Sequence, residues 1–158
     1  MSLLPHAGAP LPVTHEPIPA EELNRALAAL RALLGDRPAT VELVQQAAQQ
    51  ADVSLACAYA ALAFDPNLRV DASQETLIAI CVGGCQQQGA LANLEALLQE
   101  RAARLEAGKP AFDLLPRSCL DMCPHSPVCL SRSKQGSRAH PRLRADDVPT
   151  MIAELCAE

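Results

Sequence analysis

Four cysteines stand in two pairs of identical spacing, and they are the residues best suited to chemistry in this chain. Cys81 and Cys85 enclose Val-Gly-Gly, and Cys119 and Cys123 enclose Leu-Asp-Met. Paired thiolates bind metals. A 2Fe–2S cluster held by one pair per iron and a structural zinc ion are both consistent with this spacing. The spacing therefore predicts a metal site and leaves iron–sulfur and zinc open.

The overall composition favours a metal site over disulfides. The chain has 158 residues and seven cysteines, and an odd number suits a disulfide framework poorly. Its first residues, Met1-Ser-Leu-Leu-Pro-His, lack the basic and apolar regions of a secretory signal. We therefore expect a cytoplasmic location, where thiols stay reduced. No stretch approaches the roughly 20 apolar residues that a membrane span needs.

Charge and motifs exclude several function classes. The net charge of −5 argues against a general nucleic-acid binder. There is no phosphate-binding glycine motif, no dinucleotide fingerprint and no Ser-His-Asp arrangement. The chain is therefore not expected to bind a nucleotide or a flavin by itself.

The first 70 residues are expected to be an arm followed by helices. Residues 1–18 hold four prolines and no hydrophobic period, which predicts an extended arm. Periodic leucines and capping residues then predict three helices. They run from about Pro19 to Gly35, from Thr40 to about Gln50, and from Leu55 to Phe64. Short turns join them, so residues 19–70 are expected to form a small three-helix bundle.

Residues 71–158 have the pattern of an α+β domain, an α/β sandwich with the cysteine pairs on loops at strand ends. The expected elements are a strand over 76–80 that ends at Cys81, a helix from about 87 to 107, a strand over 111–115 that is weakened by Pro116, a strand over 128–130, a polar and basic loop over 131–144, and a final helix from 146 or 147 to about 155.

The surroundings of the first pair favour a redox cluster somewhat over zinc. Cys85 is expected at the start of a helix, whose N-terminus lowers a thiol pKa. Gly83 and Gly84 would expose backbone amides, and no side chain between Leu77 and Leu94 is charged. Amides near a cluster raise its potential, and carboxylates would lower it.

Other notable residues have simpler interpretations. Cys57, Cys129 and Cys156 are expected to be buried apolar residues. A basic run between residues 131 and 144 is either a solvated loop or a docking surface for an acidic partner. Its members are Arg132, Lys134, Arg138, Arg142 and Arg144.

With these motifs in view, the chain resembles the small 2Fe–2S subunit of the NADH-oxidising module of respiratory complex I. The same family includes diaphorase subunits of NAD-linked hydrogenases and formate dehydrogenases. The resemblance runs from about Glu21 to Leu155. It rests on Leu55-Ala-Cys-Ala-Tyr-Ala-Ala-Leu-Ala-Phe64, the strand into Cys81, Cys85 followed by Gly89-Ala90, Cys119-Leu-Asp-Met-Cys123-Pro-His-Ser-Pro127, and Leu143-Arg-Ala-Asp-Asp-Val148.

This resemblance implies a thioredoxin-like 2Fe–2S ferredoxin domain over residues 71–158, behind the helical bundle. It implies that Cys81, Cys85, Cys119 and Cys123 ligate one 2Fe–2S cluster. The chain would be a non-catalytic electron-transfer subunit of a multisubunit NAD(P)H-linked oxidoreductase, without direct membrane insertion. FMN and NAD would lie on a partner subunit, next to the cluster.

Two alternatives stay open. One is a free-standing 2Fe–2S ferredoxin, although a diffusing carrier has no evident need for three extra helices. The other is a structural zinc-binding or cluster-free adaptor subunit. It is supported by the first cysteine loop, in which three residues separate Cys81 from Cys85 where the family usually has four.

Overall fold

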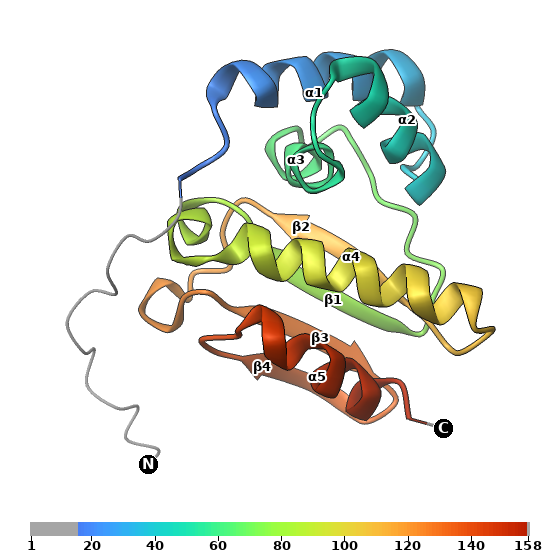
Figure 1. Cartoon of the computed structure of the whole chain (residues 1–158), viewed down its shortest axis with the longest axis vertical. Coiled ribbons are helices and arrows are strands. Elements are labelled where there is room, and N and C mark those ends of the chain that lie inside the picture. Colours follow the sequence, from blue (N-terminus) through green and yellow to red (C-terminus); the bar gives the residue numbers. More distant parts are fainter. Residues whose placement is uncertain (1–15, 158) are drawn as a thin grey trace.

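The computed structural model describes residues 16–157, which form a mixed α/β structure with five α-helices and one four-stranded sheet in that range (Figure 1). The elements in chain order are α1 (Ala20–Leu34), α2 (Val41–Ala51), α3 (Leu55–Ala61), β1 (Thr76–Cys81), α4 (Ala90–Glu106), β2 (Phe112–Arg117), β3 (Cys129–Ser133), β4 (Gly136–His140) and α5 (Val148–Leu155). Short 3₁₀ segments, η1 (Leu62–Phe64), η2 (Gly84–Gln88), η3 (Cys123–His125) and η4 (Ala145–Asp147), connect several of them.

The sheet has the strand order β2-β1-β3-β4. β1 and β2 are parallel and are joined through α4, whereas β3 pairs antiparallel with both β1 and β4. Along β1, Ile78 and Ile80 are buried while Leu77 and Ala79 are partly exposed, the alternation of a sheet with one covered face. α4 and α5 lie over the same face of the sheet in Figure 1.

The three predicted N-terminal helices are present at the expected places because their ends carry local signals. The hydroxyls of Thr40 and Ser54 accept hydrogen bonds from the amides of Leu43 (3.3 Å) and Cys57 (3.0 Å) and so cap α2 and α3. Gly35 ends α1 with a positive φ of 54°. Helices α1–α3 pack on one another, and α3 also contacts α4 and β2.

One hydrophobic core joins these helices to the sheet, since buried residues from α1 to α5 belong to a single cluster. The boundary near residue 70 between a bundle and a ferredoxin domain stays a prediction. Of the expected arm over residues 1–18, residues 1–15 lie outside the described residues.

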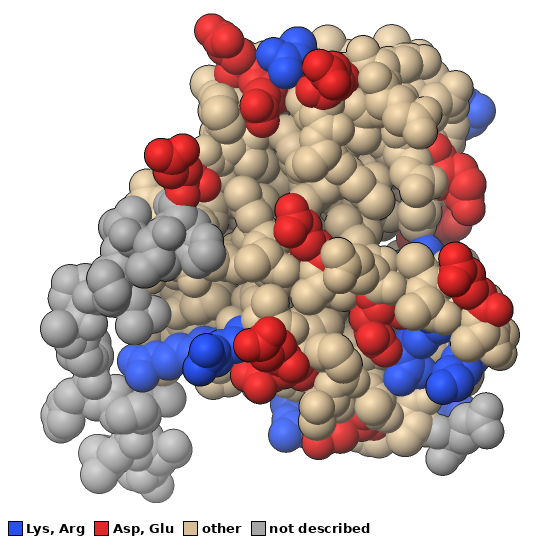
Figure 2. All heavy atoms as spheres, in the orientation of Figure 1, with Lys and Arg blue, Asp and Glu red and all other residues tan. Residues whose placement is uncertain are grey.

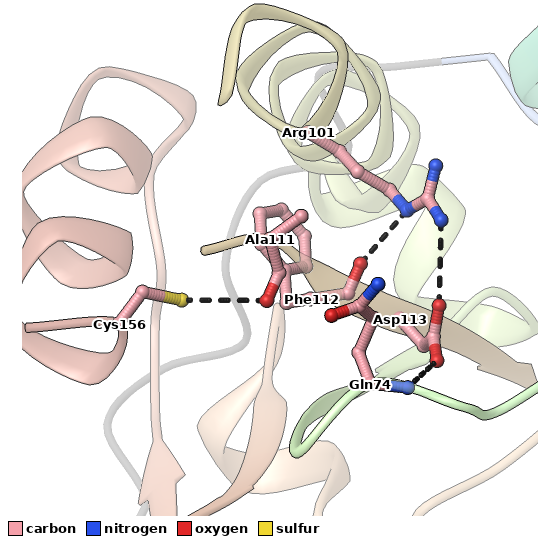
Figure 3. A network of polar contacts seen from close by, with 6 residues as sticks. All are labelled: Gln74, Arg101, Ala111, Phe112, Asp113 and Cys156. Atoms are coloured by element: carbon pink, nitrogen blue, oxygen red, sulfur yellow. Dashed lines mark hydrogen bonds and ion pairs between the residues drawn. The ribbon is translucent and has the colours of Figure 1, made fainter. Parts of the chain in front are cut away.

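A polar network fixes α4 on the sheet (Figure 3). Arg101 of α4 donates from Nε to the carbonyl oxygen of Phe112 at 2.8 Å. Its Nη2 also donates to Oδ1 of Asp113 at 3.4 Å. The other oxygen of Asp113 accepts from the backbone N–H of Gln74 at 2.6 Å. The buried carboxylate therefore joins α4, β2 and the segment that leads into β1.

Three sequence predictions for the C-terminal half are wrong in detail. Residues 131–144 are not a loop, because β3 extends to Ser133 and β4 pairs with it in a hairpin. β2 runs through Pro116 to Arg117, because an edge strand tolerates the missing proline N–H. The long helix begins at Ala90 and not at Gln87, since Gly89 adopts a φ of 101° between η2 and α4.

The surface carries both signs of charge. Figure 2 shows acidic side chains spread over the whole face in view, with basic side chains mainly on the half that holds the sheet. Within residues 16–157, no helix combines the length and the apolar character that crossing a membrane requires.

Candidate metal centre

The first cysteine loop leaves the end of β1 and is held against the end of β2. Cys81 is the last residue of β1, and Cys85 lies in η2. The N–H of Val82 donates to the carbonyl oxygen of Arg117 at 2.7 Å. A Cβ atom on Gly83 would lie 2.0 Å from the carbonyl oxygen of Ser118, so only glycine permits this approach.

Gln86 stabilises the same loop, a role that no sequence pattern indicated. Its side chain is buried, accepts from the N–H of Ile18 at 2.7 Å and donates to the carbonyl oxygen of Val82 at 2.5 Å. It therefore links the segment before α1 to the first cysteine loop. Only burial distinguishes Gln86 from Gln87 and Gln88, and burial is not visible in a run of three identical residues.

The thiols of Cys81 and Cys85 are buried and interact directly. The pKa of Cys81 is lowered, first by its hydrogen bond with the Cys85 thiol and then by the backbone N–H groups of Gly83, Leu120 and Cys85. The same contact raises the pKa of Cys85, with burial adding to the rise. The sequence prediction that a helix N-terminus lowers the pKa of Cys85 is therefore wrong, because α4 starts five residues later, at Ala90.

The second pair follows β2 and is exposed to solvent. The sulfur of Cys119 accepts from the N–H of Asp121 at 3.3 Å and lies 3.5 Å from Oδ1 of the same residue. The N–H favours the thiolate, but desolvation and the Asp121 carboxylate outweigh it, so the pKa of Cys119 is raised. Cys123 begins η3, four residues further along the chain.

The two cysteine loops adjoin each other. The sulfur of Cys81 lies 3.8 Å from the carbonyl oxygen of Ser118, and the side chains of Leu120 and Met122 pack against a buried group that contains Cys81 and Cys85. Within residues 16–157, however, no three His, Cys, Asp or Glu side chains converge as metal ligands do. The structure thus unites the first pair and places the second pair on the neighbouring loop, with its thiols turned to solvent.

The surroundings of these thiols fit a thiolate-bound, negatively charged group. Backbone N–H groups of Gly83 and Leu120 point at Cys81, and that of Val128 points at Cys85. Donors of this kind stabilise negative charge on sulfur. The glycine loop therefore supplies an amide to this site, as the sequence predicted.

The three remaining cysteines are buried in the core, as predicted from their positions. Burial raises the pKa of Cys57 to about 11 and that of Cys129 to about 12. Cys156 directs its sulfur at the carbonyl oxygen of Ala111, 4.0 Å away (Figure 3). The thiols of Cys57 and Cys129 are therefore protonated at neutral pH, as expected of small apolar residues.

A groove of about 780 Å³ runs from η1 to Cys119. Phe64, at 37% exposure, and the side chains of Leu115 and Pro116 contribute to its wall. Arg117 and Arg69 also line it. It gives the exposed side of the cysteine loops an open approach from solvent.

Among the comparisons with known proteins, solved structures alone give matches. No protein-family model and no curated protein matches the chain. Among solved structures, it is similar to a wild-type thioredoxin-like [2Fe–2S] ferredoxin from Aquifex aeolicus, with 19% identity and a TM-score of 0.43 over 52% of this chain and 84% of that chain. A second structure of such a ferredoxin from Aquifex aeolicus matches with 16% identity and a TM-score of 0.42 over 52% and 79%. Similarity of this extent does not by itself assign a fold family, a cofactor or a function.

Proposed function

We propose that the chain is an electron-transfer protein that carries one 2Fe–2S cluster on Cys81, Cys85, Cys119 and Cys123. The observation that supports this most directly is the pair of adjoining loops. One loop carries Cys81 and Cys85 from the end of β1, and the adjoining loop carries Cys119 and Cys123 from the end of β2, its parallel neighbour. Thiolate pairs are the usual ligands of such clusters.

When bound, a 2Fe–2S cluster supplies reversible one-electron transfer. The residues around the cysteines would stabilise charge on sulfur, exclude water and leave one side of the site open to solvent. The N–H groups of Gly83 and Leu120 stabilise negative charge on sulfur, and the side chains of Leu120 and Met122 exclude water from the buried pair. Cys119 and Cys123 face solvent, so electrons would enter and leave on that side.

The finer proposal is a subunit of a multisubunit NAD(P)H-linked oxidoreductase, next to a partner that binds FMN and NAD. Residues 19–70 would form its three-helix bundle and residues 71–158 a thioredoxin-like ferredoxin domain. The sequence resemblance supports this assignment, and so does the lack of any nucleotide-binding motif, because the electron donor must then be bound elsewhere.

A structural zinc-binding or cluster-free adaptor is the second candidate. Two observations favour it. The four thiols do not converge on one point within residues 16–157, and the loop between Cys81 and Cys85 is short. A free-standing ferredoxin would share the cluster but would need no partner.

Metal analysis separates these candidates. Protein purified without oxygen should contain about two irons and two acid-labile sulfides per chain, the composition of a 2Fe–2S cluster. Iron, zinc and sulfide are measured on the same sample, with the double variant Cys81→Ser/Cys119→Ser as the control that binds neither metal. One zinc per chain without sulfide would replace the electron-transfer proposal by the adaptor.

The partner proposal predicts a charge-dependent association. Arg132, Lys134 and Arg138 lie exposed on the β3–β4 hairpin of a chain with net charge −5. Tagged protein from its native host should co-purify with a flavin-containing subunit. Reversal of these three residues to glutamate should slow association, most of all at low salt, because the steering charge changes sign.

Lys109→Glu, on the exposed turn between α4 and β2, is the control and should bind like the unchanged chain. The cluster spectrum should be the same in all three proteins. Purification as a flavin-free monomer, together with no effect of the triple reversal, would exclude a subunit role and leave the free-standing ferredoxin.

A further inference from the structure

Ser126 presents a buried hydroxyl without a partner. The residue is 7% exposed, and its Oγ is the one buried side-chain nitrogen or oxygen within residues 16–157 that makes no hydrogen bond. Burying a hydroxyl without a partner is unfavourable, and such atoms are rare in folded proteins. A neighbouring thiol that becomes a thiolate would accept this hydrogen bond and remove the cost.

The position of Ser126 identifies the acceptor. Its backbone N–H donates to the carbonyl oxygen of Cys123 at 3.1 Å, which fixes the turn after the second cysteine pair. Its hydroxyl lies beside the sulfur of Cys85, and the N–H of Val128 approaches the same sulfur. The segment from Cys123 to Val128 thus connects the two pairs, with Ser126 directed at a sulfur of the first pair.

We propose that Ser126 donates a hydrogen bond from its hydroxyl to the sulfur of Cys85 in the loaded protein, and that this bond raises the reduction potential of the cluster. The inference rests on the proposed function, since it concerns the 2Fe–2S cluster assigned above. Ser126 is a positioning and tuning residue and not a ligand. The structural feature that supports this role is the unpaired hydroxyl of Ser126 beside the thiol of Cys85.

The sign follows from charge. A 2Fe–2S cluster with four thiolates is an anion, and reduction by one external electron makes it more negative while the hydroxyl proton stays on Ser126. A donor to a ligand sulfur stabilises the more negative state more strongly, so it favours the reduced form. Removal of the hydroxyl should therefore lower the potential.

The test is a potentiometric titration of the loaded full chain. The EPR signal of the reduced cluster reports the reduced fraction at each potential. Ser126→Ala should reduce the ratio of reduced to oxidised cluster at a fixed potential about tenfold, which corresponds to 59 mV for a one-electron couple. Ser131→Ala is the matched control. Ser131 is also buried, but its hydroxyl already bonds Nε2 of His140 at 2.8 Å, on β4, so its removal should leave the potential unchanged.

A second pair of variants serves if Ser126→Ala does not hold its cluster. Ser126→Thr and Ser126→Val have nearly the same volume and differ by one hydroxyl, so the threonine variant should have the higher potential. Equal potentials in this pair, or in Ser126→Ala and the unchanged chain, would overturn the inference. Failure of the unchanged chain to bind iron and sulfide would instead overturn the proposed function, so the two failures are distinct.

Discussion

Cys123→Ser should remove most of the visible absorption of anaerobically purified protein, whereas Cys57→Ala and Cys156→Ala should leave it intact. Cys119 and Cys123 supply half of the proposed ligands, and serine is a poor substitute because iron–sulfur clusters depend on thiolate ligation. Both control residues are buried in the main core cluster, which does not contain Cys81 or Cys85. The measurement is the absorption spectrum together with iron content per chain.

Cys129 makes this experiment decisive. It lies in β3 opposite Ile80, one residue before Cys81, and is completely buried. Cys129 is therefore the cysteine that could most readily replace Cys119 or Cys123 as a cluster ligand. Cys129→Ala should keep the spectrum, because desolvation holds that thiol protonated. Bleaching as severe as that of Cys123→Ser would assign Cys129 to the ligands and remove Cys123 or Cys119 from them.

The elements that sequence predicted correctly are those with local signals at their ends. Thr40 and Ser54 mark helix starts through their own hydroxyls, and Gly35 marks a helix end through its own φ. β1 was predictable because a short run of apolar residues is typical of a buried strand, and the strand is indeed largely buried. β4 was not, since Gly-Ser-Arg-Ala-His lies at the edge of the sheet, is largely exposed and has no apolar alternation. Pairing with β3, not local preference, makes it a strand.

The candidate site shows the same division. The pattern of apolar runs predicted both cysteine pairs on loops at strand ends, and the pairs lie at the ends of β1 and β2. Spacing could not show that the first pair is buried and the second exposed, because that difference comes from Leu120 and Met122 packing over the first loop. The role of Ser126 was equally hidden, since its burial depends on residues distant in sequence. Contacts between loops decide these features, and no local pattern records such contacts.

Gly83→Ala should prevent cluster assembly, and Gly84→Ala should not. A Cβ on Gly83 would meet the carbonyl oxygen of Ser118 at 2.0 Å, and this obstacle is backbone that cannot rotate away. The first cysteine loop would have to move from the second, and the adjacent hydrogen bond from Val82 to Arg117, 2.7 Å long, would be strained or lost. We expect a loss of about 1–3 kcal/mol in stability, typical of overpacking at a close contact.

Gly84 is the matched control, because it is the next residue in the same loop and a Cβ there would have no atom within 4 Å. Its alanine variant should be as stable as the unchanged chain or more stable by about 0.4–1 kcal/mol, since alanine restricts the unfolded state. Urea midpoints and iron content should be measured on both variants. If Gly83→Ala retains iron and sulfide at the level of Gly84→Ala, close approach of the two loops is not a condition for binding. The cluster would then be held by a different arrangement of the thiols. If Gly83→Ala loses the cluster while its urea midpoint stays near that of Gly84→Ala, the contact between Gly83 and Ser118 serves to position the ligands and contributes little to the fold.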